Sequence, residues 1–266
     1  MAQSYIDFRQ VDFRYDSGLG AAPNWILKGL DLTIERGEFY VLLGPSGCGK
    51  TTALSLLAGF EHAHGGSLTV GGGPVTAPGV DRVVIFQGDD SLYGWLTAQE
   101  NVEFGLKVAG VPAAERRRKA EQQLEFVGLG KQGHKFPSQL SGGMKQRIQI
   151  ARALVCESPI LLMDEPFAAL DAQTRAILQD ELTTIQQRTA STVLFITHDI
   201  GEAIILADRV GIMRSGPGSA LKEEIEIPLP RPRRRGDPAF GALYDRIHAV
   251  LSEEVTRVLR REQASQ

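Results

Sequence analysis

The segment Gly44–Thr51, GPSGCGKT, constrains the fold of this 266-residue chain more than any other part of it. A short apolar run, Phe39–Leu43, precedes it, and a helical pattern over Thr51–Phe60 follows it. Glycines let backbone N–H groups converge on an anion without Cβ clashes, and a helix directs its positive end at the same point. A strand, a glycine-rich loop ending in Lys-Thr and a helix, in this order, predict a phosphate-binding loop. A plain glycine turn at a strand end would not require the Lys-Thr pair.

This loop predicts a nucleotide site with a metal ion. Lys50 should reach the β- and γ-phosphates, and the hydroxyl of Thr51 should ligate Mg²⁺. The predicted nucleotide-binding residues of the loop are Gly44, Pro45, Ser46, Gly47, Cys48, Gly49, Lys50, Thr51 and Thr52.

A second candidate site follows the apolar run at the start of ILLMDEP, Ile160–Pro166. A strand that buries its apolar side chains can present acids only from its end. Asp164 is placed to hold Mg²⁺ through a water molecule, and Glu165 is a candidate general base for an attacking water. Acids at strand ends are common, so this pair gains its meaning from the phosphate-binding loop.

Strands alternate with helices along most of the chain, which favours an α/β domain with a mainly parallel sheet. Two alternating stretches, Tyr5–Tyr15 and Trp25–Ile34, predict an antiparallel pair joined by a turn over Asp16–Pro23. Further strands are predicted over Leu68–Val70, Val83–Phe86, Ile160–Met163 and Thr192–Ile196, and helical patterns over Thr97–Val127, from near Ser141, over Asp171–Arg188 and over Ala239–Arg261.

Composition narrows the class of protein. The formal net charge is −3 and the pI is about 6.0, without the basic excess of a nucleic-acid binder. Cys48 and Cys156 are the only cysteines, so we expect a reducing compartment and no disulfide scaffold. The N-terminus lacks the apolar core of a signal peptide. No apolar run approaches the roughly 20 residues that span a bilayer, so any membrane-spanning part would belong to another chain.

The stretch LSGGMKQR, Leu140–Arg147, resembles the signature motif of the ABC (ATP-binding cassette) family, with Met144 where Gln is usual. Ser141, Gly142 and Gly143 would begin a helix and form a second anion-binding end. One chain cannot close both helix ends on the same γ-phosphate. The resemblance implies a head-to-tail homodimer, in which the signature of one chain covers the ATP held by the other.

Four further positions match the family in the same order. Tyr15 resembles the aromatic residue that stacks on adenine, although a strand tyrosine in a core or at an edge is the alternative. Gln87 resembles the glutamine that contacts Mg²⁺ and the attacking water. Asp171 ends a stretch that resembles the D-loop, which crosses the dimer interface in the family. His198 resembles the switch histidine that holds the γ-phosphate, whereas an isolated histidine is more often structural.

The resemblance is closest to importer subunits of the nitrate, aliphatic sulfonate and taurine group, on the stretches LLAGF, DEPFAALDAQTR, THDIGEA, RSGPG and LPRPR. It implies a P-loop NTPase (RecA-like) core with an antiparallel β subdomain and an inserted α-helical subdomain. The implied boundaries are residues 1–87 and 158–230 for the core with its β subdomain, 88–157 for the helical signature subdomain, and 231–266 for a C-terminal linker and helix.

The resemblance also implies the cofactors ATP and Mg²⁺, and the partners. Transmembrane permease subunits would dock near Gly88–Leu96, where Gly94 replaces a proline that relatives often carry. An extracytoplasmic substrate-binding protein would act indirectly, and no nucleic acid is expected. The chain would lie as a peripheral subunit on the cytoplasmic face of the inner membrane and power import of a small oxyanion such as a sulfonate, taurine or nitrate.

Other nucleotide hydrolases fit less well. Chromosome-maintenance ATPases place a long coiled coil between loop and signature, but Lys50 and Ser141 are only 91 positions apart. Ribosome-acting relatives carry two cassettes in one chain, whereas this chain has one. A GTPase would need an Asn-Lys-x-Asp motif to recognise guanine, and the sequence lacks it. A small-molecule kinase would not need LSGG. A scaffold without catalysis would lack Lys50, Glu165 or His198. A soluble, non-transport ABC ATPase is the alternative left open. The arginines of Arg231–Arg235 are expected to be solvated on a linker.

Overall fold

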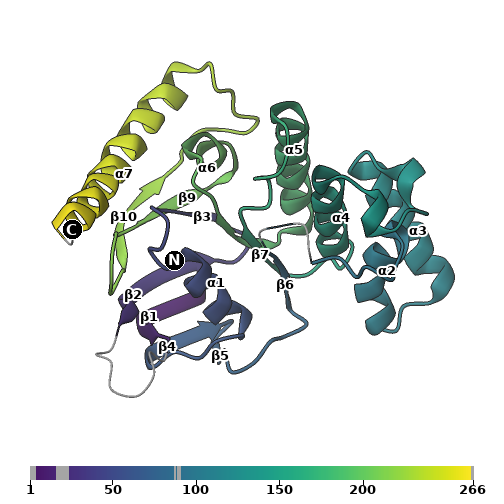
Figure 1. Cartoon of the computed structure of the whole chain (residues 1–266), viewed down its shortest axis with the longest axis horizontal. Coiled ribbons are helices and arrows are strands. Elements are labelled where there is room, and N and C mark those ends of the chain that lie inside the picture. The colour runs from purple at the N-terminus through teal and green to yellow at the C-terminus, as the bar shows by residue number, and fades with distance from the viewer. Residues whose placement is uncertain (1–3, 16–23, 87, 89–90, 265–266) are drawn as a thin grey trace. The chain divides into compact units, whose positions relative to one another are not determined.

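The computed structural model describes residues 4–15, 24–86, 88 and 91–264 (Figure 1). The chain forms two compact units. The first contains residues 1–79 and 186–266, and the second contains residues 80–185. Helix α5, Ala172–Thr189, begins in the second unit and ends in the first.

The first unit contains an antiparallel sheet in which the strands follow the order β2-β1-β4-β5. Its strands are β1 (Ser4–Arg14), β2 (Trp25–Glu35), β4 (Gly65–Val70) and β5 (Gly73–Pro74). The pairing of β1 with β2 places Ile6 opposite Ile34 and Phe8 opposite Leu32, and all four side chains are buried. The predicted antiparallel pair of strands is therefore confirmed. The predicted turn over Asp16–Pro23 lies outside the described residues.

The same unit contains buried parallel strands. These are β3 (Phe39–Leu43), β8 (Thr192–Ile196) and β9 (Arg209–Met213), with β10 (Leu221–Glu226) antiparallel to β9. Strand β3 lies between β8 and β9 and runs parallel to both. Every residue of β3 and of β8 is buried, as a continuous apolar run predicts for a parallel sheet. The carboxyl ends of β3 and β8 therefore lie at the same edge.

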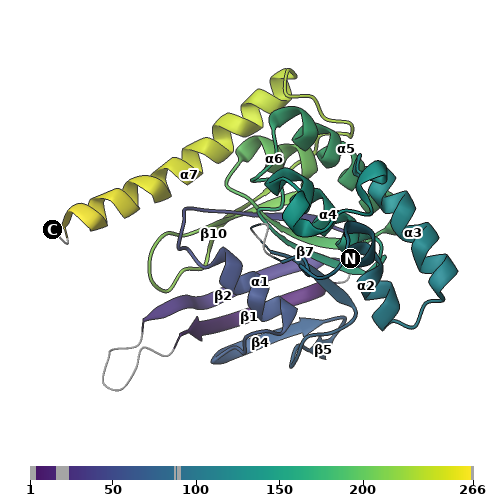
Figure 2. The same cartoon turned by 45° about the vertical axis from the view of Figure 1, so that its right-hand side comes forward.

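Besides the end of α5, three helices lie within the described part of this unit. They are α1 (Lys50–Ala58), α6 (Ile200–Leu206) and α7 (Pro238–Ala264). Figure 1 and Figure 2 both show α7 running past α6 and β10. The carboxylate of Glu254 on α7 is fully buried and accepts hydrogen bonds from the backbone N–H and the hydroxyl of Ser215, at 2.7 and 2.8 Å. The C-terminal helix is therefore bound to the loop that joins β9 and β10.

The second unit combines a short parallel strand pair with a block of helices. Its elements are β6 (Arg82–Ile85), β7 (Ile160–Asp164), α2 (Ala98–Val108), α3 (Ala113–Phe126) and α4 (Gly142–Leu154). The helical pattern over Thr97–Val127 is two helices rather than one. Gly110 adopts a positive φ of 76° and Pro112 is the N-cap of α3, so the chain turns between them.

No helix in the described part of the chain is long and apolar enough to cross a membrane.

Candidate functional site

The loop between β3 and α1 is closed by its own lysine. The Lys50 ammonium donates hydrogen bonds to the carbonyl oxygens of Gly44, at 2.8 Å, and Pro45, at 3.0 Å. Lys50 is only 8% exposed, whereas Ser46, Gly47 and Thr51 are exposed. The loop thus surrounds the Lys50 ammonium, while its central residues and the Thr51 side chain are exposed to solvent.

At two positions of this loop, Gly44 and Gly49, a side chain would collide with a neighbouring residue. A Cβ at Gly44 would lie 2.7 Å from the sulfur of Cys48, so any side chain there would collide. Gly49 has a φ of 89°, and a Cβ there would lie 2.7 Å from a methyl carbon of Leu27. Burial raises the pKa of the Cys48 thiol, with Lys50 opposing that shift. Cys48 therefore acts here as a small buried side chain rather than as a thiolate.

The amino end of α1 carries no side-chain cap. Gly49 is the N-cap residue and supplies no side-chain hydrogen bond to the first turn. Thr51 is exposed and Thr52 is buried, so only the first of the two threonine hydroxyls faces solvent. A helix end with positive partial charge, beside a buried ammonium, suits a polyphosphate.

His198 lies at the same sheet edge as this loop. Leu42 of β3 is in register with Ile196 of β8, so Gly44 and His198 each follow a parallel strand at its carboxyl end. The His198 side chain is exposed, and both of its sequence neighbours are bonded. Thr197 donates its hydroxyl proton to the buried carboxylate of Glu202 at 2.6 Å, and the Asp199 carboxylate accepts from the N–H of Glu202 at 3.0 Å.

Tyr15 follows the end of β1 and is 51% exposed. Its ring meets the ring of Phe13 edge to face, with the centroids 4.9 Å apart. A tyrosine buried in the core is thereby excluded.

In the second unit, the predicted acids lie at the carboxyl end of the buried strand β7. Asp164 is the last residue of the strand and is 4% exposed, whereas Glu165 is partly exposed. Glu165 has a φ of 46°, in the left-handed region that non-glycine residues seldom adopt. Such a conformation costs on the order of 1–3 kcal/mol and clusters at functional sites. The chain therefore bends at Glu165, directly after the strand that ends in Asp164.

The signature segment begins helix α4 as predicted. Ser141 is the N-cap residue, and its hydroxyl accepts a hydrogen bond from the N–H of Met144 at 3.3 Å. Ser141 is exposed, while Gly142 and Gly143 are half-buried. The first turn of α4 contains no acidic residue, so its positive end is not neutralised locally.

The predicted D-loop packs against the signature. A Cβ at Gly143 would lie 3.5 Å from the carbonyl oxygen of Ala169. Asp171 is exposed, and its carboxylate accepts hydrogen bonds from the N–H and the hydroxyl of Thr174 at 2.9 and 2.7 Å. These bonds lower the pKa of Asp171, the backbone bond most. Asp171 thus caps the start of α5 while facing solvent beside the signature helix.

Gln87 lies outside the described residues, but two residues shortly after it, Gly88 and Ser91, are bonded to α4. Gln149 donates a hydrogen bond to the carbonyl of Gly88 at 2.8 Å, and Arg152 donates to the carbonyl and the hydroxyl of Ser91 at 2.8 and 3.1 Å. Neither Gln149 nor Arg152 was predicted from the sequence. Their spacing of three places them on one face of the helix that the signature begins, which is the signal that could have found them.

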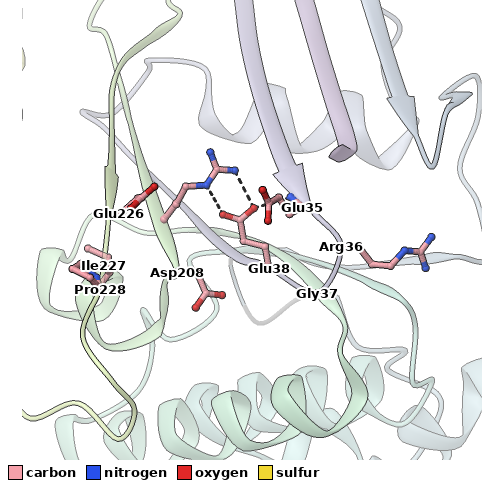
Figure 3. A pocket seen from close by; sticks show the side chains of 9 residues that line it. Glu35, Arg36, Gly37, Glu38, Asp208, Glu226, Ile227 and Pro228 are labelled. Atoms are coloured by element: carbon pink, nitrogen blue, oxygen red, sulfur yellow. Dashed lines mark hydrogen bonds and ion pairs between the residues drawn. The ribbon is translucent and has the colours of Figure 1, made fainter. Parts of the chain in front are cut away.

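A separate cavity of about 410 Å³ in the first unit is lined by charged residues (Figure 3). Glu38 accepts from the Arg209 guanidinium at 2.6 and 3.0 Å, and these bonds raise the Arg209 pKa. None of the residues that line the cavity belongs to the phosphate-binding loop. Four acids and two arginines line the cavity, so it has no excess of positive charge to bind a polyphosphate, and it is not the nucleotide site.

Comparison with known proteins agrees with this geometry. The ABC transporter family model matches residues 27–168. A taurine import ATP-binding protein of Chromobacterium violaceum is 47% identical over 86% of this chain and 87% of its own length. A nitrate import ATP-binding protein of Synechococcus elongatus is 44% identical over 83% of this chain and 82% of its own length.

Solved structures agree as well. An ATP-binding cassette in a dimeric, post-hydrolysis state with bound ADP and Pi superposes with a TM-score of 0.75, at 29% identity, over 84% of this chain and 98% of the other. The predicted fold class, a P-loop NTPase core with an antiparallel β subdomain and a helical subdomain, is thereby confirmed. The chain belongs to the ABC transporter family and is one of its ATP-hydrolysing, ATP-binding subunits.

Proposed function

We propose that this subunit powers import of a small oxyanion, such as a sulfonate, taurine or nitrate, through a separate transmembrane subunit. The observation that carries the proposal is the similarity along most of the chain to import proteins for taurine and nitrate. Both molecules present oxygen-rich anionic groups. A soluble ABC ATPase without a transport partner is the competing function.

In the nucleotide site, Lys50 would exchange its bonds to the Gly44 and Pro45 carbonyls for the β- and γ-phosphate oxygens. The backbone N–H groups from Gly44 to Thr52 would surround the phosphates, and Tyr15 would stack on the adenine. This assignment uses the exposure of Tyr15, Ser46 and Gly47 and the burial of the Lys50 ammonium.

Magnesium suits the donors that are present. Thr51 offers a hydroxyl oxygen and Asp164 a buried carboxylate at the end of β7, and Mg²⁺ prefers few protein oxygens together with phosphates. The described residues contain no cluster of three or more His, Cys, Asp or Glu side chains that could hold a metal ion. Gln87 would contact the same ion. When bound, Mg²⁺ would neutralise phosphate charge during transfer.

Hydrolysis would use Glu165 and His198. Glu165 would accept the proton of the attacking water, because it directly follows Asp164, the proposed metal ligand, at the end of β7. His198 would hold the γ-phosphate from the neighbouring strand end. Gln87 would orient the water.

The active unit would contain two copies of the chain. Ser141, Gly142 and Gly143 of one copy would cover the nucleotide of the other, and Asp171 would lie at the interface. The signature is suited to this role because Ser141 is exposed at an uncompensated helix start. The similar cassette that was solved with ADP and Pi is dimeric.

Permease subunits would dock near Gly88–Leu96, with an extracytoplasmic substrate-binding protein acting indirectly, at the cytoplasmic face of the membrane. We also propose that the chain divides into the core at residues 1–87 and 158–230, the helical signature subdomain at residues 88–157, and the C-terminal linker and helix at residues 231–266. The test is co-expression with candidate transmembrane subunits. Taurine, an alkanesulfonate or nitrate should stimulate ATP hydrolysis in reconstituted vesicles that carry the binding protein. Stimulation only by sugars, peptides or metals would reject the substrate class, and absence of any membrane partner would favour the soluble ATPase.

A further inference from the structure

The segment Leu229–Arg233, LPRPR, has no task in the nucleotide site, yet its last arginine is heavily bonded. The half-buried guanidinium of Arg233 donates to five backbone carbonyls. Three of them lie at the end of α6, one lies two residues before the segment, and one is in its first residue: Ile204 (2.7 Å), Ile205 (3.4 Å), Ala207 (2.5 Å), Ile227 (3.1 Å) and Leu229 (2.9 Å). This arginine therefore joins the segment to the carboxyl end of α6.

Helix α6 needs such a partner. It has seven residues, and a helix this short is marginal without tertiary support. The last four carbonyls of a helix have no intrahelical donor and carry partial negative charge. Burial lowers the Arg233 pKa to about 10, with the charge of Arg231 adding to the shift. The side chain thus remains charged at neutral pH and meets the helix end as a desolvated cation.

Arg231 fixes the same end of α6 to strand β3. Its guanidinium donates to the carbonyl of Leu206 and lies 2.6 Å from the carboxylate of Asp208. That carboxylate also accepts the N–H of Phe39 at 2.9 Å, and the N–H of Asp208 donates to the carbonyl of Phe39 at 2.7 Å. Asp208 is on the wall of the cavity in Figure 3. The end of α6 is therefore tied to the start of the strand that leads to the phosphate-binding loop.

The opposite end of α6 holds the backbone around His198. Asp199 is its N-cap residue, and the carboxylate of Glu202, in its first turn, accepts the hydroxyl proton of Thr197. Both neighbours of His198 are thus bonded to the first turn of α6. Arg235 reaches this end too, since a Cβ at Gly201 would lie 2.5 Å from its Nη1 atom.

We infer that Arg231 and Arg233 are positioning residues for His198, because they hold the carboxyl end of the short helix whose amino end fixes the histidine. The inference rests on the proposed role of His198 at the γ-phosphate. A displacement of about 1 Å at a reacting group can lower a rate about 10²-fold. Neither arginine contacts the nucleotide in this scheme, so the loss should fall on kcat rather than on ATP binding.

The test uses the full chain with Arg233→Gln, Arg231→Gln and Arg233→Lys, and Arg234→Gln as the matched control. Arg234 is an exposed arginine in the same segment. We expect Arg233→Gln to lower kcat by about 10- to 100-fold, with the Kd of a fluorescent ATP analogue within threefold of the parent. Arg233→Lys keeps the charge but lacks the planar fork of donors, so its kcat should lie in between. The control should match the parent. If Arg233→Gln does not fold, Arg233→Lys and Arg231→Gln carry the test.

A double-mutant cycle with His198→Ala separates positioning from general destabilisation. If the arginine acts through the histidine, His198→Ala combined with Arg233→Gln should be no slower than His198→Ala alone. Three results would each overturn the inference. They are full additivity of the two substitutions, a kcat within twofold of the parent in the single arginine variants, and a parallel loss of ATP affinity and thermal stability. An inactive His198→Ala beside an active Arg233→Gln rejects this inference alone. A fully active His198→Ala rejects the proposed role of His198 itself.

Discussion

The ammonium of Lys50 lies 2.8 Å from the carbonyl oxygen of Gly44, so the lysine near the end of the phosphate-binding loop is bonded to the residue that begins it. The loop is therefore already folded around the Lys50 ammonium. On binding, nucleotide phosphates would replace the Gly44 carbonyl as the acceptor of the ammonium's hydrogen bonds. Pre-organisation of this kind reduces the ordering cost of binding.

Replacing Lys50 should weaken nucleotide binding without unfolding the chain. A hydrogen bond to a charged group contributes about 1.5–3 kcal/mol, so Lys50→Ala should raise the Kd for ATP roughly 10- to 100-fold. Equilibrium binding of a fluorescent ATP analogue measures this change. Lys131→Ala removes an exposed lysine elsewhere and serves as the control. An unchanged Kd in Lys50→Ala would contradict the assignment of the loop.

Glu165→Gln should separate binding from hydrolysis. The amide keeps the shape of the side chain but cannot accept the proton of the attacking water, so kcat should fall about 10²–10⁴-fold. The Kd for ATP should stay within a few-fold of the parent, and the variant should accumulate as an ATP-bound dimer on size exclusion. Steady-state hydrolysis near the parent rate would show that Glu165 is not the base.

Ser141→Arg should abolish hydrolysis while ATP still binds. The substitution puts a bulky cation on the exposed helix start that is proposed to cover the partner's nucleotide. Mixing this variant with Glu165→Gln provides the sharper measurement, because each mixed dimer contains one intact composite site and should recover part of the activity. No recovery, together with a specific activity of the parent that is independent of dilution, would argue for an active monomer.

Features that depend on a few neighbouring residues could be predicted from the sequence. The loop Gly44–Thr51, the strand before Asp164 and the helix after Ser141 each depend on patterns of a few residues, and all three occur as predicted. Helix α6 and strands β9 and β10 were not predicted. The seven residues of α6 are too few for a clear periodicity.

The expectation of solvated arginines over Arg231–Arg235 was wrong for two of them. Arg233 bonds a carbonyl 29 positions away, at Ile204, and Arg231 bonds an acid 23 positions away, at Asp208. Composition alone describes such a segment as a linker, since its partners are known only once the chain has folded. The same holds for Arg152 and Ser91, which are 61 positions apart.

Acid should loosen the C-terminal helix through Glu254. Burial raises the pKa of this carboxyl, but bonds from Ser215 and from Lys222, at 3.1 Å, outweigh it and leave the pKa lowered. A carboxyl with a lowered folded pKa stabilises the fold above its unfolded pKa and loses that contribution as pH falls through the folded value. Glu254→Gln should therefore cost about 1–3 kcal/mol of unfolding free energy at pH 7, measured by urea titration. The difference from the parent should shrink as pH falls towards 4, and a constant difference would contradict this account.

Tyr93 and Trp95 should respond differently to truncation, although both belong to the proposed docking segment. Tyr93 is half-buried, its ring centroid lies 4.5 Å from that of Phe104, and Asn101 bonds both its N–H and its carbonyl. Trp95 is 74% exposed. Tyr93→Ala should therefore lower the thermal stability of the isolated chain, because it removes packing of this segment on α2.

Trp95→Ala should leave that stability and the basal hydrolysis unchanged, since the ring contributes little to the fold. Exposed aromatic side chains are typical anchors of an interface. Co-purification with the membrane subunits should fall, as should hydrolysis stimulated by the transported solute. Val108→Ala truncates another apolar side chain of the same unit, 73% exposed, and should affect neither measurement. If Trp95→Ala assembles and is stimulated as the parent is, the permease does not dock through this residue.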